Sequence, residues 1–173
     1  MWQQKTHRLH KNSFSFPLHL LILFEEKMKK LLWIPVLAVA AFAAPAMARD
    51  TTLHLPLSDV LQMPEAKEKL DNSFKFFLAG QATPRVLEKL GEGVSNPKTS
   101  GFAKSDETGC KWAALSALIS LQKSAKREGA NAVIDIVSFY KKQEARNDIT
   151  YECHAGAIIV GVALKGTYAK IAD

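Results

Sequence analysis

Apolar and polar residues alternate from Thr51 to Leu57. This period of two predicts a strand with one buried face. Pro56 predicts that the strand lies at a sheet edge, because proline donates no ladder hydrogen bond. Pro64 suits the first turn of a short helix that continues to Leu70. The aromatic stretch Phe74–Leu78 predicts a second strand.

The stretch that follows has mixed signals. Thr83 and Pro84 resemble a cap and a first-turn proline, so we expect a helix through Leu90 that ends at Gly91. Residues 91–101 are rich in Gly, Ser, Asn and Pro and predict a loop. Its Lys-Thr pair resembles the end of a phosphate-binding loop, but Pro97 stands where that motif needs glycine, so no nucleotide site is expected.

A long amphipathic helix is indicated after Ser105, whose hydroxyl can cap it and which is followed by two acidic residues. Small and apolar residues recur at helical spacing until Gly129 ends the pattern. These are Ala114, Leu118, Leu121 and Ala125, widened by Leu115 and Ile119, with Ser116, Ser120, Lys123 and Arg127 opposite. We interpret the stripe as core.

Two further strands are expected at Ala132–Tyr140 and Ile149–Leu164, joined by the charged loop Lys141–Asp148. The short connection favours an antiparallel hairpin. Alternation assigns Tyr151, Cys153, Ala155, Ala157 and Ile159 to one face of the second strand, and Glu152, His154, Ile158, Val160 and Val162 to the other. The predicted fold is α+β: one small, mostly antiparallel sheet with the Cys110–Glu128 helix packed across a face.

The second of these faces, continued by Leu164, is too apolar to stay in water. We expect the short helices, Pro64–Leu70 and the one after Pro84, to cover it. A monomer is therefore favoured over a homo-oligomer.

The N-terminal part has the layout of an export signal. Basic Met28–Lys30 precedes the apolar run Leu31–Ala44, and Ala46 and Ala48 supply the small residues that a signal peptidase reads. We predict a signal peptide over 28–48, cleaved between Ala48 and Arg49. The run is shorter than the roughly 20 residues needed to span a bilayer, so no stable membrane anchor is expected after processing. We interpret residues 1–27 as a mis-called extension, and 49–173 as one domain.

Processing changes the meaning of the charge. The chain has 23 basic and 17 acidic residues, a net charge of +6. Residues 1–48 hold six of the basic and two of the acidic ones, which leaves 17 and 15 and a net charge of +2 for residues 49–173. A nucleic-acid partner is therefore not expected.

Both cysteines lie in the exported part, Cys110 at the start of the long helix and Cys153 on the strand face that the helix should cover. An oxidising compartment favours a structural disulfide between them. Two buried free thiols, or a redox or metal pair, are the alternatives. We therefore expect a bacterial protein that is periplasmic or secreted.

One polar group could carry chemistry. His154 and Glu152 share a strand face, and Asp135 on the partner strand could join them, depending on register. Such a set could bind a metal or move protons. A solvated polar edge is the more common outcome, and no nucleophile elbow, zinc signature or paired-carboxylate pattern occurs. We therefore expect no enzyme and no cofactor, and keep the His154, Asp135 and Glu152 site as the alternative.

The helix carrying Cys110, the Gly129–Val133 segment, Cys153 and the Gly161–Leu164 stretch resemble the RcsF family of envelope-stress lipoproteins. The helix, Gly-Ala-Asn-Ala-Val and hairpin pattern is also similar to the YbjQ family of small oligomeric proteins with a proposed metal-related role. The resemblance covers about residues 105–166. It implies that Cys110 and Cys153 form one of two RcsF-type disulfides, since Ile159 replaces a cysteine of the second.

The lipidated cysteine of the RcsF family is missing here, and so is its proline-rich anchor. Small secreted proteins sometimes labelled as an excinuclease ATPase subunit look closer, but this sequence has no ATP-binding loop. We expect a non-enzymatic envelope module that binds or senses an unknown envelope protein or small ligand.

Overall fold

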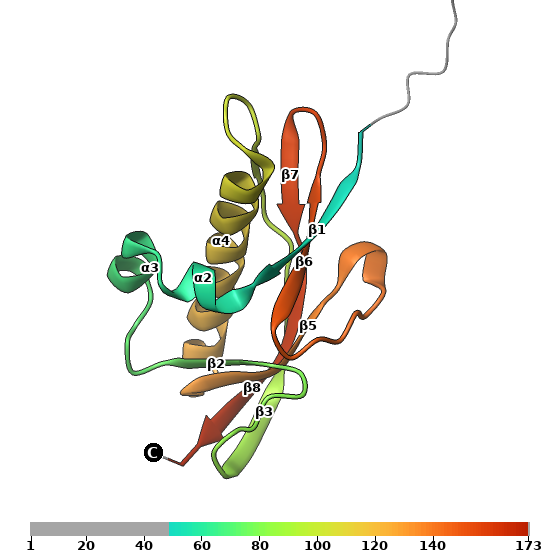
Figure 1. Cartoon of the computed structure of the whole chain (residues 1–173). Coiled ribbons are helices and arrows are strands. Elements are labelled where there is room, and N and C mark those ends of the chain that lie inside the picture. Colours follow the sequence, from blue (N-terminus) through green and yellow to red (C-terminus); the bar gives the residue numbers. More distant parts are fainter. Residues whose placement is uncertain (1–48, 173) are drawn as a thin grey trace, which may run out of the picture. The chain divides into compact units, whose positions relative to one another are not determined.

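The computed structural model describes residues 49–172. The predicted extension, the signal peptide and Ala48 lie outside the described residues. The elements run in the order β1 (Thr51–Pro56), α2 (Leu57–Leu61), α3 (Pro64–Lys69), β2 (Lys75–Leu78), β3 (Val86–Ser95), β4 (Lys98–Ser100), α4 (Asp106–Arg127), β5 (Ala132–Ser138), η1 (Tyr140–Lys142), β6 (Thr150–Ala155), β7 (Ile159–Val162) and β8 (Leu164–Ile171) (Figure 1).

The strands form two four-stranded sheets, in the orders β1-β6-β7-β4 and β2-β5-β8-β3. Every pairing is antiparallel except that of β2 with β5. Helix α4 packs against strands of both sheets. The predicted α+β class is thus confirmed, with two sheets where one was expected. Only Ala163 separates β7 from β8, so the chain passes directly from one sheet into the other.

Helix α4 forms where the sequence indicates. The Ser105 hydroxyl accepts a hydrogen bond from the Thr108 N–H at 3.2 Å, and the helix ends before Gly129, whose φ is +80°. The predicted stripe of Ala114, Leu118, Leu121 and Ala125 is buried, and the opposite side is exposed. The apolar stripe therefore faces the core, as expected for an amphipathic helix.

The Gly-Ala-Asn-Ala turn after α4 is hydrogen-bonded to the end of β8. The Asn131 side chain accepts from the Ile171 N–H at 2.8 Å and donates to the Ile171 carbonyl at 3.0 Å. Its own N–H donates to the Ala169 carbonyl at 3.1 Å. The Asn131 side chain therefore bonds to the backbone of β8 where the pairing with β5 ends, which explains why asparagine stands in this turn.

The helix expected after Thr83 is wrong, because the chain there enters strand β3. Pairing with β8 along most of its length satisfies the β3 backbone, which outweighs a local cap signal. Gly91, expected as a helix stop, lies with φ +135° beside a register shift of this ladder. The expected loop 91–101 contains the end of β3 and all of β4.

The expected hairpin is also wrong, because β5 pairs with β2 and β8 and not with β6. The predicted long strand is interrupted between β6 and β7, where the Gly156 N–H bonds to the Ile159 carbonyl. The predicted assignment of side chains to the inner and outer faces is correct as far as Ala155. After the interruption the two faces exchange, so Val160 is buried and Ile159 is 55% exposed.

This reversal changes what covers the apolar residues. Val160, Val162 and Leu164 are buried in the core that α4 covers, so the short helices are not needed there. Of the residues predicted to share that apolar face, Ile158 is the exposed one, at 66%. Oligomeric state stays a prediction.

The two cysteines form the predicted disulfide, with Sγ atoms 2.01 Å apart and both residues fully buried. It joins the first turns of α4 to β6. A disulfide is compatible with an oxidising extracytoplasmic location. Within residues 49–172, no helix combines the length and apolar character needed to cross a membrane.

Candidate functional site

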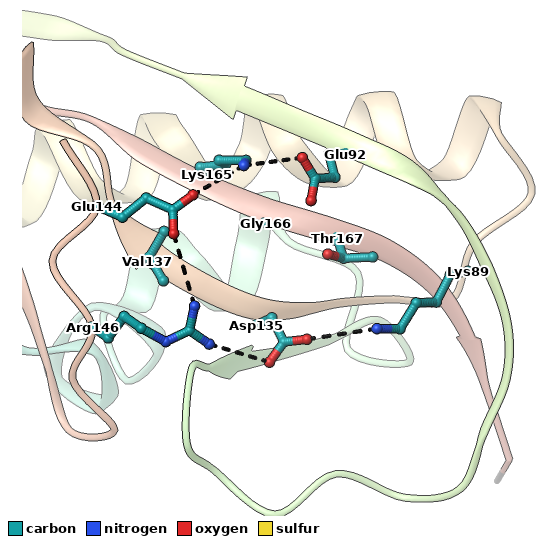
Figure 2. A pocket seen from close by; sticks show the side chains of 9 residues that line it. All are labelled: Lys89, Glu92, Asp135, Val137, Glu144, Arg146, Lys165, Gly166 and Thr167. Atoms are coloured by element: carbon teal, nitrogen blue, oxygen red, sulfur yellow. Dashed lines mark hydrogen bonds and ion pairs between the residues drawn. The ribbon is translucent and has the colours of Figure 1, made fainter. Parts of the chain in front are cut away.

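A charged hollow lies on the face of the β2-β5-β8-β3 sheet that points away from α4 (Figure 2). Gly166 faces the core, since a Cβ there would meet Val133 and Ile136. Its neighbours Lys165 and Thr167 therefore point to the other side. The hollow measures about 190 Å³ and is lined by Lys89, Glu92, Asp135, Val137, Glu144, Arg146, Lys165, Gly166 and Thr167.

Six of these side chains form a line of alternating charge, which runs Glu92, Lys165, Glu144, Arg146, Asp135, Lys89 (Figure 2). Lys165 Nζ lies 3.0 Å from both Glu92 and Glu144, and Arg146 lies 3.8 Å from Glu144 and 3.9 Å from Asp135. Three cations thus balance three carboxylates.

A β-bulge places Asp135 in the hollow. It is the one exposed residue of β5, its φ is +51°, and the β5–β8 register shifts between Ile134 and Val137. Aspartate tolerates this left-handed conformation better than most residues. The extra residue places Ile136 in the core that α4 covers and Ile134 in a second buried cluster, while the Asp135 carboxylate points into the hollow.

The two ends of the charged line differ. At one end, hydrogen bonds from Lys165 to Glu144 and Glu92 raise the pKa of the lysine, so it stays charged. At the other end, Asp135 lies 3.9 Å from Arg146 and 4.0 Å from Lys89, beyond hydrogen-bond distance. Those three side chains are 48%, 60% and 62% exposed. They keep capacity for another partner.

His154 belongs to a second cluster, on the outer face of the other sheet. Its Nδ1 lies 3.0 Å from Asp50, its ring stacks on Tyr140 with centroids 3.4 Å apart, and its Nε2 lies 3.8 Å from Glu152. Hydrogen bonding to His154, with smaller contributions from Tyr140 and Lys141, lowers the pKa of Asp50 below its ordinary value. The cluster ties the start of β1 to β6.

The structure brings together two of the three predicted site residues. His154 and Glu152 are neighbours, whereas Asp135 lines the charged hollow of the other sheet. Within residues 49–172, no three His, Cys, Asp or Glu side chains are grouped so as to hold a metal ion. The alternative of a site shared by all three side chains therefore does not hold for Asp135, which lies on the other sheet.

Sequence reasoning missed Asp50 and Tyr140 as partners of His154. A signal for Asp50 was present, because it continues the outward-facing alternation of Thr52 and His54 along β1. The β1–β6 register also places His54 opposite Glu152. Tyr140 reaches the histidine from η1, a turn that no local pattern predicts.

No family model matches the chain, and a search of curated proteins returns no match.

Proposed function

We propose that this protein is a small extracytoplasmic binding domain that contacts its ligand through the charged hollow without catalysing a reaction. The observation that carries the proposal is the spacing of the charged side chains at the Asp135 end of the line. Arg146 and Lys89 lie on either side of Asp135, none of the three within hydrogen-bond distance of another, all at least 48% exposed.

This geometry suits a small ligand that carries both charges, such as an amino acid or a short peptide. A ligand carboxylate would accept hydrogen bonds from Arg146, whose planar guanidinium matches it, and from Lys89. A ligand ammonium would donate to Asp135. The exposed positions make the binding weak and sensitive to salt.

Charge pairing supports binding over catalysis. Lys165 is hydrogen-bonded to two carboxylates and has a raised pKa, so it is no amine nucleophile at neutral pH. The carboxylates at that end already accept from a cation. The resemblance to RcsF and YbjQ families supports the same kind of module, a sensing or binding domain of the envelope.

The predicted signal peptide and the disulfide support an extracytoplasmic location. Intact-mass measurement of the exported protein should show Arg49 as the first residue. A mature species that keeps the Leu31–Ala44 segment would contradict this processing.

The binding proposal is tested by NMR titration of the oxidised protein with glycylglycine, at low and high salt. Amide shifts should change around Asp135 and Thr167, and N-acetylation or C-amidation of the dipeptide should weaken them. The D135N variant should lose the response. Its matched control is E88Q, because Glu88 pairs with Lys170 at 3.1 Å outside the hollow. E88Q should keep the amide shift changes of the wild type. If D135N showed the same shift changes as E88Q, the hollow would be excluded as the site.

A further inference from the structure

We infer that one end of the domain is an apolar tip that inserts into the surface of an anionic membrane. The apolar tip consists of Phe102 and Ala103 from the loop before α4, and Ala157, Ile158 and Ile159 from the β6–β7 turn and the start of β7. Phe102 is 76% exposed, Ile158 66% and Ile159 55%. Both loops lie at the same end of the molecule (Figure 1). This inference is independent of the charged hollow.

The two loops are joined to each other. The Gly101 N–H donates to the Ile158 carbonyl at 2.7 Å, and Ser100 pairs with Ile159 in the β4–β7 ladder. A Cβ on Gly101 would lie 3.0 Å from a methyl of Val160, so the loop rests on the core. The exposed side chains are thus presented by a fixed framework.

Several backbone groups in and beside the apolar tip are hydrogen-bonded within the protein. The Gly156 N–H donates to the Ile159 carbonyl at 2.9 Å, and the Lys104 N–H donates to the Gly101 carbonyl at 3.3 Å. The Phe102 N–H donates to the Ser100 hydroxyl at 3.2 Å. These bonds lower the cost of moving the two loops toward lipid, because each unpaired polar group taken out of water costs free energy.

The charges around the apolar tip suit anionic headgroups. Lys98 and Lys104 are exposed, and neither has an ion-pair partner within 4.0 Å among residues 49–172. The acidic residues that begin α4 are paired, Asp106 with Arg49 and Glu107 with Lys111. The two free cations therefore remain to attract an anionic surface, at about 1 kcal/mol each.

The size of the apolar tip favours lipid over a protein partner. A fully buried aromatic side chain covers roughly 150–250 Å², so one phenylalanine and two smaller isoleucines stay below the about 800 Å² per partner of a stable protein interface. Apolar side chains flanked by lysines combine the two attractions that hold a peripheral segment at a bilayer surface, namely buried apolar area and charge. The contact is peripheral and involves no spanning segment.

The test is sedimentation of the exported, oxidised protein with vesicles, after its mass has confirmed removal of the apolar leader. Vesicles of equal phosphatidylglycerol and phosphatidylcholine should bind the protein, and pure phosphatidylcholine should bind at least five-fold less. The F102S/I158S variant should lose at least five-fold of the binding. The K98Q/K104Q variant should lose the preference for anionic vesicles.

The matched control is L87S/I149S, because Leu87 and Ile149 are 56% and 62% exposed but lie outside the apolar tip. It should bind vesicles like the wild type. Retention of the disulfide and an unchanged circular dichroism spectrum establish that each variant is folded. F102S/I158S should keep its response to glycylglycine, and D135N should keep vesicle binding, so each proposal can fail alone.

Two results would overturn the inference. One is a wild-type protein that stays in the supernatant with anionic vesicles, or an F102S/I158S variant that binds them as the wild type does. The other is a wild-type dimer by light scattering that F102S/I158S converts to a monomer, which would assign the apolar tip to contacts between copies.

Discussion

Replacing the Cys110–Cys153 disulfide by two alanines should lower the free energy of unfolding by about 4 kcal/mol. The two residues are 43 positions apart. The chain-entropy relation for a loop of that length gives a denatured-state restriction of about 4 kcal/mol at 25 °C. Domains of this size are typically stable by about 5–15 kcal/mol, so the variant should fold but with a much smaller margin.

Alanine is the informative replacement because both sulfur positions are fully buried. A serine hydroxyl there would add a desolvation cost of about 1–3 kcal/mol and obscure the effect of the crosslink. The alanine pair leaves a small cavity at the contact between α4 and β6, which adds to the loss.

The assay is equilibrium unfolding in urea, followed by circular dichroism. The oxidised wild type, C110A/C153A and the wild type with reductant are compared. The second and third should have similar unfolding free energies, both far below the first. A loss below about 1 kcal/mol for C110A/C153A would refute the crosslink as a main stabiliser and shift the emphasis to the core around α4.

Three further predictions follow from packing, charge and association. G166A should destabilise by about 1–3 kcal/mol, because its Cβ would lie 2.5 Å from a buried valine methyl; G161A, with 3.6 Å to its nearest neighbour, is the control, and equal melting temperatures would contradict the packing. Hydrogen bonding to His154 lowers the pKa of Asp50 below 3.8, so its stabilisation is complete above that pH and is lost as pH falls through the lowered value. The melting-temperature difference between wild type and D50N should therefore shrink on acidification below 3.8, and a constant difference would argue against the pair. Light scattering coupled to size exclusion should give the mass of one chain, and twice that mass would refute the monomer.

The sequence predicts best where one physical signal dominates. Helix α4 has a capping serine, acidic first turn, apolar stripe and terminal glycine that all agree, and it forms as expected. The first strand, its edge position and the cysteine pair are also predictable, because alternation, Pro56 and the expected oxidising compartment each have a direct structural meaning.

The failures occur where long-range pairing decides. Residues after Pro84 have a local cap signal for a helix, but β8 pairs with them along most of the segment and they form β3. The short connection predicts a hairpin between β5 and the strand that follows Ile149. In the structure, β2 and β8 occupy the two edges of β5, so β6 cannot pair with it. The charged hollow depends on this choice and on the bulge at Asp135, so no reading of neighbouring residues could assemble it.

The single residue between β7 and β8 limits how the domain can move. A hinge between two sheets needs a few residues that absorb backbone rotation, and Ala163 is itself buried. Helix α4 packs on both sheets and so further restricts the swing of one against the other. A partner would therefore meet a preformed surface with little cost of rearrangement, and slow closing motions on the microsecond-to-millisecond scale should be absent from relaxation measurements on residues 49–172.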